Sequence, residues 1–464
     1  MKERKTFKGS LGFVLAAASS AVGLGNIWRF PYLAAKDGGG IFLFVYLILA
    51  VTFGFALLTT EVSIGRKTKQ SPLTCYGYIN KNWKWLGIIS CLVPAIIMPY
   101  YCAIGGWVIK YMITFISGNG LAAAEDGYFT GFITAPWSPV VLMIIFLCLC
   151  TFVILAGVNR GIEASARIIM PILIVLVLII SVYSLTLSST DVDGVTRTGW
   201  EGLKIYIAPD FKSMTLGKLL VVTVDAMGQL FFSLSVAMGI MIAYGSYVHD
   251  DANLVKSINQ IEIFDTGIAF LAGVMIIPAV FTFMGTDGLA SAGPGLMFVS
   301  LPKVFASMGP IGTVIGIMFF VLVLFAAVTS AVSIMEAVVS SIMDQFHVSR
   351  KAAAVIEFVI ALVVGVIVCF GYNRLYFEYT LPNGSVAQVL DILDYISNNI
   401  LMPFGAIATC ILIGWVVGPK VITDEVTKNG EHFGREKLFI VMIKYIAPVL
   451  LLVLLLKSIG IITI

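Results

Sequence analysis

The sequence predicts an all-α integral membrane protein of eleven transmembrane helices, the first and sixth of which are broken near the middle of the bilayer. Three observations lead to this prediction. Only 12% of the 464 residues are charged and 59% are hydrophobic, whereas soluble domains carry about 25% charged residues. The hydrophobic residues form long runs, most of them uncharged. Two of the runs contain dense clusters of small and polar residues.

Seven uncharged runs reach the roughly 20 residues with which a helix crosses the hydrocarbon core of a bilayer. Four more runs are mostly apolar but are interrupted by Arg29, Asp225, Glu357 or Lys444. The first run is long and no small-residue cleavage site closes it, so we expect it to be kept as a span. In chain order, the predicted spans cover about 9–35, 41–60, 85–109, 138–159, 168–190, 218–247, 266–286, 304–335, 350–372, 395–419 and 436–462.

The basic residues predict the orientation of the chain. The segment between spans 3 and 4 holds Glu125 and Asp126, whereas the segment between spans 2 and 3 is basic, with Arg66, Lys67, Lys69, Lys81 and Lys84. Because cytoplasmic loops carry an excess of Lys and Arg, we expect the N-terminus in the cytoplasm and, with eleven spans, the C-terminus outside. A bacterial inner (plasma) membrane is the expected location. The seven cysteines show no metal spacing and no pair in an outer loop, so neither metals nor disulfides are expected.

Two spans are expected to be broken, at 19–26 in span 1 and 233–239 in span 6. Polar irregular backbone at mid-membrane depth is tolerated only where it lines a cavity enclosed by protein, and matching breaks in two halves point to a midplane binding site. One such cluster alone would more simply indicate close helix packing through small residues. The single domain 1–464 is therefore expected to contain two inverted five-helix repeats, at about 10–187 and 218–416, and one extra C-terminal helix at about 436–462.

Several motifs resemble those of one known family. The run Ser20-Ala-Val-Gly-Leu-Gly-Asn-Ile-Trp-Arg-Phe-Pro-Tyr32, followed by Gly38-Gly-Gly40, closely resembles the first-span signature of the neurotransmitter:sodium symporter family. The resemblance implies a sodium-coupled symporter of the bacterial amino-acid transporter branch, which imports its substrate by alternating access. Further matches follow in order along nearly the whole chain, at Glu61-x-x-x-Gly-Arg66, Pro99-Tyr-Tyr101, Gly228-Gln-x-Phe-Phe-Ser-Leu-Ser235, Thr329-Ser330 and Leu393-Asp-Tyr395.

The resemblance also implies a substrate site. An unpaired carboxylate is costly in a low-dielectric site, and the amides at the break in span 1 can face it with a positive half-helix dipole behind them. Tyr101 resembles the family tyrosine whose hydroxyl donates to this carboxylate. Gly23 stands where relatives that carry monoamines have an aspartate, which favours an α-amino acid, although a glycine can also serve only tight packing.

The side chain of the substrate is expected to meet an apolar surface. No acidic or basic residue is found among the matching positions, so a neutral, hydrophobic amino acid fits best. Met238 replaces a family aromatic residue and can repack, although it and the isoleucines can also be ordinary core. The expected substrate-binding residues are Ala21, Gly23, Leu24, Gly25, Ile97, Tyr101, Phe232, Ser233, Ser235, Met238, Ser330 and Ile334.

One or two sodium sites are implied by the same resemblance, because unwound backbone supplies the oxygen ligands that sodium needs. Asp265 takes the place of an asparagine found in many relatives and adds a fixed negative charge, so chloride is expected to be dispensable. A shift of one residue in the alignment would place Phe264 there instead. Site one resembles the set Ala21, Asn26, Ser233 and Asp265, and site two resembles Ser19, Val22, Ala326, Thr329 and Ser330. Thr329 and Ser330 by themselves would more simply bond back to their own helix.

Two gates are implied as well. Arg29 and Asp394 resemble the outer charge pair that closes above the substrate, with Phe232 and Tyr101 as a lid beneath it. The inner latch resembles the set Arg4, Asp344 and Tyr247, while Glu61 and Glu336 are expected to be internal contacts between helices.

Other classes of protein remain as alternatives. An enzyme would need a catalytic constellation, but the three histidines, at 249, 347 and 432, lie at predicted cytoplasmic edges. A passive channel would need a continuous polar stripe, and an amino-acid-binding sensor of the same fold would bind without transport. The expected partners are an amino acid and the lipid bilayer, with no nucleic acid, and the protein is expected to be a monomer or weak dimer. Asp225 and Lys444 have no role in this interpretation.

Overall fold

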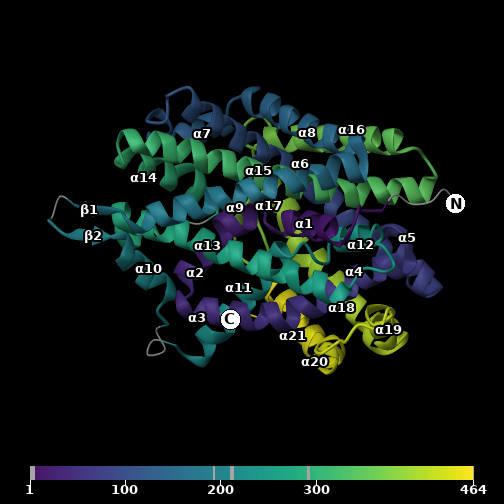
Figure 1. Ribbon diagram of the computed structural model, residues 1–464. Coiled ribbons are helices and arrows are strands. Elements are labelled where there is room, and N and C mark those ends of the chain that lie inside the picture. Colours follow the sequence, from purple (N-terminus) through teal and green to yellow (C-terminus); the bar gives the residue numbers. More distant parts are fainter. Residues whose placement is uncertain (1–5, 192–193, 210–213, 290–292, 463–464) are drawn as a thin grey trace.

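The computed structural model describes residues 6–191, 194–209, 214–289 and 293–462, and most of these residues are helical (Figure 1). Among them, nine helical stretches are long and apolar enough to cross a membrane, or ten if one strongly bent pair counts as a single span. The predicted all-α membrane architecture is therefore confirmed at this level.

The first half of the chain supplies the helices up to the first short hairpin. Helix α8 turns into α9 at Gly157, whose φ of 88° is left-handed and suits a residue without a Cβ. The helices are α1 (Ser10–Ala21), α2 (Phe30–Lys36), α3 (Gly40–Leu49), α4 (Phe55–Thr68), α5 (Pro72–Ile79), α6 (Lys84–Ile116), α7 (Tyr128–Ile133), α8 (Ser138–Gly157) and α9 (Ala164–Leu185). Strands β1 (Ser188–Thr190) and β2 (Thr196–Thr198) pair antiparallel.

The second half contains the longest helices. Several predicted boundaries differ from the structure. The span expected at 304–335 begins at Pro310, because Gly309 (φ 68°) separates it from a short helix, and it continues to Phe346. The span expected at 266–286 begins at Leu254, because the helix extends through polar residues that lie outside the apolar run. The helices are α10 (Gly199–Ile207), α11 (Leu216–Ser233), α12 (Ile240–Gly245), α13 (Leu254–Gly288), α14 (Leu301–Ser307), α15 (Pro310–Phe346), α16 (Arg350–Phe370), α17 (Val389–Asp394), α18 (Met402–Ile411), α19 (Lys420–Val426), α20 (Glu436–Val441) and α21 (Ala447–Ser458). Strands β3 (Tyr379–Thr380) and β4 (Val386–Ala387) form a second small hairpin.

The first predicted break lies between α1 and α2. The helix stops at Ala21 and resumes at Gly25 as a wide π-helical turn (Gly25–Arg29), and its axis bends by 53° across the gap. The amide of Gly23 bonds back to the carbonyl of Ala21 at 2.9 Å. The unwound backbone is buried, as expected if it lines an enclosed cavity.

The second predicted break lies between α11 and α12. Residues 234–239 are not helical, and three of them have positive φ: Ser235 at 53°, Ala237 at 62° and Gly239 at 73°. The amide of Ala237 donates to the Glu61 carboxylate at 2.6 Å. Glu61 thus stabilises unwound backbone in the neighbouring span, which agrees with its expected role as an internal contact.

Helix α1 lies inside the bundle. It packs against α13, α15 and α9, while the long helices α6 and α15 pack along each other (Figure 1). Hairpin β1–β2 projects from one end of the molecule, and α5 and α19 lie towards the opposite end. Following the predicted orientation, we call the first end outer and the second end inner.

Candidate functional site

The break in the first span faces Tyr101 of α6. The Leu24 amide points at the Tyr101 hydroxyl from 3.5 Å, a long contact. A Cβ on Gly23 would lie 2.6 Å from the Ser330 hydroxyl and 3.3 Å from that of Tyr101. Only glycine leaves this backbone open to the space between α6 and α15.

A small cavity opens at this point, between the two breaks. The space that the centre of a water molecule can reach in it is about 20 Å³, which is room for about one water. A bound amino acid would therefore require the surrounding side chains to move outward. The lining residues are Ser20, Ala21, Gly23, Gly25, Asn26, Ile97, Tyr101, Phe232, Ser235, Met238, Ser330 and Ile334.

Most of the expected substrate-binding residues thus come together. Leu24 and Ser233 lie outside the lining, although Leu24 contributes its amide next to Tyr101. Ser20 lines the cavity but was not expected to, although it stands within the small polar cluster of span 1 that predicted the break. The side chains of Ile97, Met238 and Ile334 make one part of the wall apolar.

The first expected sodium site is a buried polar cluster around Asp265 of α13. Asp265 Oδ1 accepts hydrogen bonds from Asn26 Nδ2 at 2.8 Å and from Ser233 Oγ at 2.6 Å, and Tyr46 donates to Oδ2 at 3.3 Å. Ser233 also lies 2.9 Å from Asn26 Oδ1. The alignment register that selects Asp265 rather than Phe264 therefore places a carboxylate against both broken spans.

The second expected sodium site is divided between two kinds of contact. Ser330 Oγ donates to the Ser20 carbonyl at 2.9 Å, so it links α15 to α1. Thr329 Oγ1 instead bonds back to its own helix, at 3.0 Å from the Phe325 carbonyl and 3.2 Å from that of Ala326. The Thr329 hydroxyl therefore makes the contact expected of a lone threonine in a helix.

The outer gate leads into a second, larger cavity, which we call the vestibule. Phe232 lines both cavities and so lies between them, as expected of a lid. Within the described chain, Arg29 and Asp394 form no direct ion pair, and Asp394 instead accepts from Tyr100 at 3.1 Å and from Asn398 at 2.6 Å. The vestibule is lined by Arg29, Val224, Asp225, Gly228, Phe231, Phe232, Asn383, Asn398, Asn399, Met402, Leu454, Lys457 and Ser458.

The inner latch differs in part from the expectation. Tyr247 donates to Glu336 at 2.5 Å, and Glu336 also pairs with the Arg350 guanidinium. Asp344 accepts from the Ser71 amide at 2.7 Å, while Arg4 lies outside the described residues. Arg350 was not expected here, because its position as the first residue of α16 gives no sign that its side chain reaches back to Glu336 of α15.

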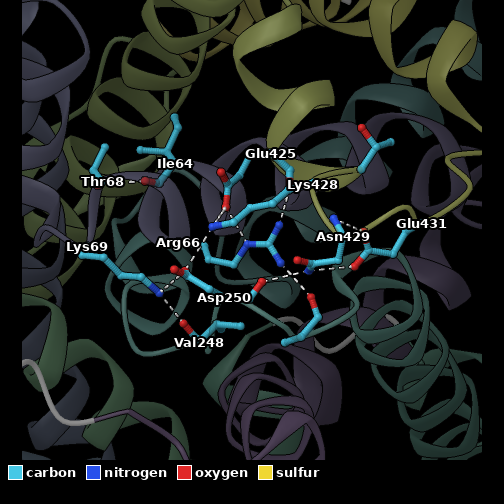
Figure 2. Close-up of polar contacts among 12 residues, drawn as sticks. Ile64, Arg66, Thr68, Lys69, Val248, Asp250, Glu425, Lys428, Asn429 and Glu431 are labelled. Carbon is cyan, nitrogen blue, oxygen red and sulfur yellow. Dashed lines mark hydrogen bonds and ion pairs between the residues drawn. The ribbon is translucent and has the colours of Figure 1, made fainter.

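Arg66, at the end of the Glu61 motif, organises the inner end of the molecule. It is fully buried and donates to the Ala252 carbonyl at 2.7 Å, to the Glu425 carboxylate at 2.7 Å and to the Glu425 carbonyl. Figure 2 shows these contacts with the neighbouring pairs that Lys69 and Lys428 make with Asp250. Helix α4, the loop after α12 and α19 are thus held together.

Two residues left unexplained by the sequence now have contacts. Lys444 lies over the Trp415 ring, 5.5 Å from its centroid, and the Trp415 indole donates to the Lys444 carbonyl at 3.0 Å. Asp225 pairs with two lysines at the outer end. Both residues therefore connect span 11 to its neighbours.

The fold and the site define a class of protein: a multi-pass membrane transporter whose two broken helices enclose a small central cavity. The model of the sodium:neurotransmitter symporter family matches residues 4–123 and 132–463. The chain belongs to this family, and the predicted family is confirmed. The chain is thus a sodium-dependent symporter, and its family is one of transporters.

Individual relatives agree with this assignment. An uncharacterised sodium-dependent transporter of Bacillus subtilis, YhdH, is 31% identical over 475 residues, which cover both chains fully. An uncharacterised sodium-dependent transporter of Haemophilus influenzae is 30% identical over 98% of each chain. The crystal structure of MhsT in complex with L-phenylalanine matches with a TM-score of 0.85 and 34% identity, over 98% of this chain and 100% of MhsT.

Proposed function

We propose that the protein imports a neutral, hydrophobic α-amino acid together with sodium by alternating access. The observation that carries this proposal is the cavity between the two breaks, where Tyr101 lines the same space as Ile97, Met238 and Ile334 and its hydroxyl lies 3.5 Å from the Leu24 amide. The amide and hydroxyl suit a carboxylate, and the apolar wall suits an uncharged side chain. The likeness to a transporter solved with L-phenylalanine supports the same substrate class.

Sodium would couple to this substrate through shared contacts. We propose site one around Asn26 and Asp265, next to the cavity, and site two between α1 and α15, where Ser330 already reaches the Ser20 carbonyl. A carboxylate that touches the first ion would make each ligand strengthen the binding of the other, as linkage requires. The charge of Asp265 supports a cycle that needs no chloride.

We also propose that eleven spans cross the membrane. The stretch Ser138–Leu185 has 48 residues, which is about 72 Å of helix, more than twice the ~30 Å hydrocarbon core. Because Gly157 interrupts it, α8 and α9 would be separate spans. Nine stretches, one of them divided in two, and the bent pair α1–α2 then make eleven. The two breaks support inverted repeats at about 10–187 and 218–416, with the N-terminus in the cytoplasm of a bacterial cell.

Uptake into proteoliposomes tests the proposed function. Purified protein would be reconstituted and offered a panel of labelled amino acids, with and without an inward sodium gradient. We expect uptake of hydrophobic amino acids that requires sodium and persists when gluconate replaces chloride. Saturable binding without uptake would favour the sensor, and uptake that ignores the gradient would favour the channel.

A further inference from the structure

An ion network at the edge of the vestibule joins three helices that are distant in the sequence. Asp225 of α11 accepts from Lys36 of α2 at 2.8 Å and from Lys457 of α21 at 3.1 Å. The Asp225 side chain is 17% exposed and the lysines are 44% and 26% exposed. Water reaches the network, but the carboxylate is largely shielded, so its pairing matters more than that of a fully exposed pair.

The end of α21 also touches the opposite side of the vestibule. Tyr395 donates to the Ser458 carbonyl at 2.8 Å, and Tyr395 follows the gate residue Asp394 directly in the chain. Lys457 and Ser458 themselves line the vestibule. The end of α21 therefore bridges the outer half of the sixth span and the segment that carries Asp394.

The charged side chains that line the vestibule in the described chain are Arg29, Asp225 and Lys457, and of these only Asp225 and Lys457 pair with each other. Arg29 lies over α11, with its Nη2 atom 3.5 Å from the position that a Cβ on Gly228 would take. Widening the vestibule would move α11 away from the α21 side. Such a movement stretches the contact between Asp225 and Lys457.

We propose that Asp225 and Lys457 are positioning residues of the transport cycle: their ion pair keeps the vestibule narrow and separates when the vestibule widens. A proton on Asp37 further stabilises the narrow vestibule. The proposal depends on the alternating access of the proposed function and not on which substrate is carried.

Asp37 lies at the C-terminal end of α2, beside the network. Its Oδ1 atom is 3.8 Å from the Lys36 ammonium, and its Oδ2 atom is buried without a hydrogen-bond partner. Burial, followed by the neighbouring charge of Asp225, raises the pKa of Asp37 to about 6. The charges of Lys36 and Lys457 act in the opposite direction, and the main influences on Asp37 include no charge from α3, α10 or α13, which also pack on α2. The negative end of the helix dipole acts in the same direction as burial.

The direction of the pH effect follows from linkage. A carboxyl whose pKa is raised in the narrow state binds a proton more tightly there than in a wide, hydrated state, where the pKa is near its ordinary 3.8. Lowering the pH through the window from about 6 to about 4 therefore favours the narrow vestibule. Above that window, Asp37 and Asp225 are both ionised, and the repulsion between these adjacent carboxylates destabilises the narrow vestibule.

The first experiment measures how readily the vestibule admits a reagent. Asn399→Cys places a thiol on the vestibule wall, and the rate of its modification by a membrane-impermeant methanethiosulfonate is measured, with the parent protein as the baseline for native cysteines. We expect Lys457→Met and Asp225→Asn each to raise the rate by about three- to tenfold, and the double variant to match the single ones. Lys204→Met, at an exposed lysine of α10, is the control and should leave the rate unchanged. Rates in both variants equal to this control would overturn the proposal.

The second experiment compares the wild-type side chain with Asp37→Asn, a mimic of the protonated carboxyl, in the same Asn399→Cys background. Because both proteins carry the same reactive thiol, the ratio of their rates cancels the pH dependence of the reagent chemistry. We expect the wild type to react severalfold faster than Asp37→Asn at pH 7.5, and the ratio of the two rates to fall as the pH is lowered through the window, reaching one near pH 4. A ratio that stays constant with pH would show that Asp37 does not act on the vestibule.

Discussion

Gly23 is one of the residues at which the site leaves no room for a side chain. A Cβ there would meet the Ser330 hydroxyl at 2.6 Å, a hydroxyl that already bonds across to the Ser20 carbonyl. The same position lies at the unwound backbone that we expect to receive a carboxylate. Two different substitutions at Gly23 can therefore separate the effect of an added side-chain volume from the effect of an added negative charge.

We expect Gly23→Asp to abolish binding of the amino acid. Two like charges ~4 Å apart repel by ~4 kcal/mol at an effective dielectric of ~20, which is near a thousandfold in affinity. Binding of the amino acid and of its decarboxylated amine would be measured by scintillation proximity. Gly23→Ala, which adds only the Cβ, is the control: it should weaken both ligands similarly, whereas Gly23→Asp should spare the amine relative to the amino acid. Full amino-acid affinity in Gly23→Asp would mean that the carboxylate binds elsewhere.

Asp265 allows a prediction about chloride. Wild-type uptake should be nearly unchanged when gluconate replaces chloride, because the carboxylate held by Asn26, Ser233 and Tyr46 supplies a fixed negative charge. Asp265→Asn removes that charge while keeping the shape, and we expect its uptake to become dependent on chloride. A severalfold loss of wild-type uptake in gluconate, with Asp265→Asn no more dependent on chloride, would contradict the prediction.

Ser330 and Thr329 test the second sodium site. Ser330→Ala and Thr329→Ala should each raise the sodium concentration for half-maximal substrate binding, because each would remove an oxygen ligand. Ser340→Ala is a matched control, since its hydroxyl bonds at 3.3 Å to a carbonyl of the same helix. If purified, folded variants keep the sodium dependence of the wild type, both hydroxyls serve only the helices that they contact here.

At the scale of single elements, the two broken spans depend on side chains that accept or donate to unwound backbone. Glu61 accepts the Ala237 amide in span 6, and Ser330 donates to the Ser20 carbonyl in span 1. Such contacts replace the helical hydrogen bonds that the breaks remove, which is necessary where water is absent. Arg66 plays a similar part at the inner end, because it satisfies the Glu425 carbonyl in the last turn of α19.

Loss of the Arg66 contacts should therefore destabilise the protein. A buried ion pair that loses one partner costs about 3–5 kcal/mol, because the remaining charge has no partner. We expect Arg66→Met to lower the midpoint of thermal unfolding in detergent, and Arg66→Met combined with Glu425→Gln to recover part of the loss. Lys428→Met, at a partly exposed neighbour that lies 3.8 Å from Glu425, should have a much smaller effect. Equal effects of the two single variants would show that the buried network contributes no special stability.

At the scale of the whole molecule, the proposed sodium and substrate sites lie at the meeting point of both halves of the chain. Residues from α1, α6, α11 and α15 line one cavity, and α13 adds Asp265 beside it. Since the central space holds about one water as it stands, binding must shift the equilibrium between a narrow and a wider arrangement. Ligands that favour the same arrangement then increase each other's affinity.

This coupling predicts how ligands stabilise the protein. A ligand that binds only the folded state raises stability by RT ln(1 + [L]/Kd), about 2.7 kcal/mol at a concentration of 100 Kd. We expect the transported amino acid to raise the midpoint of thermal unfolding in sodium but to have little effect when choline replaces sodium. An equal shift in both salts would show that substrate binds without sodium.

Much of the architecture could be predicted from the sequence, because a hydrophobic run of bilayer length can form few structures other than a membrane-spanning helix. The runs predicted membrane helices, and the small polar clusters predicted both breaks. The boundary at 304 was wrong since the apolar run continues through Gly309, and composition alone does not reveal the turn there. Asp265 was found only through the family register, because an acidic residue within a span can serve many contacts.

The sequence by itself determined the membrane class, the two breaks, the family and most of the residues that line the cavity, since local composition and motif order carry this information. Only the tertiary structure decided the long-range partners: Arg350 for Glu336, Glu425 for Arg66, and Lys36 with Lys457 for Asp225. It also decided that Arg29 and Asp394 are not in direct contact. The physical reason is that an ion pair forms wherever packing brings two charges within a few ångströms, and packing is a property of the whole fold rather than of the spacing along the chain.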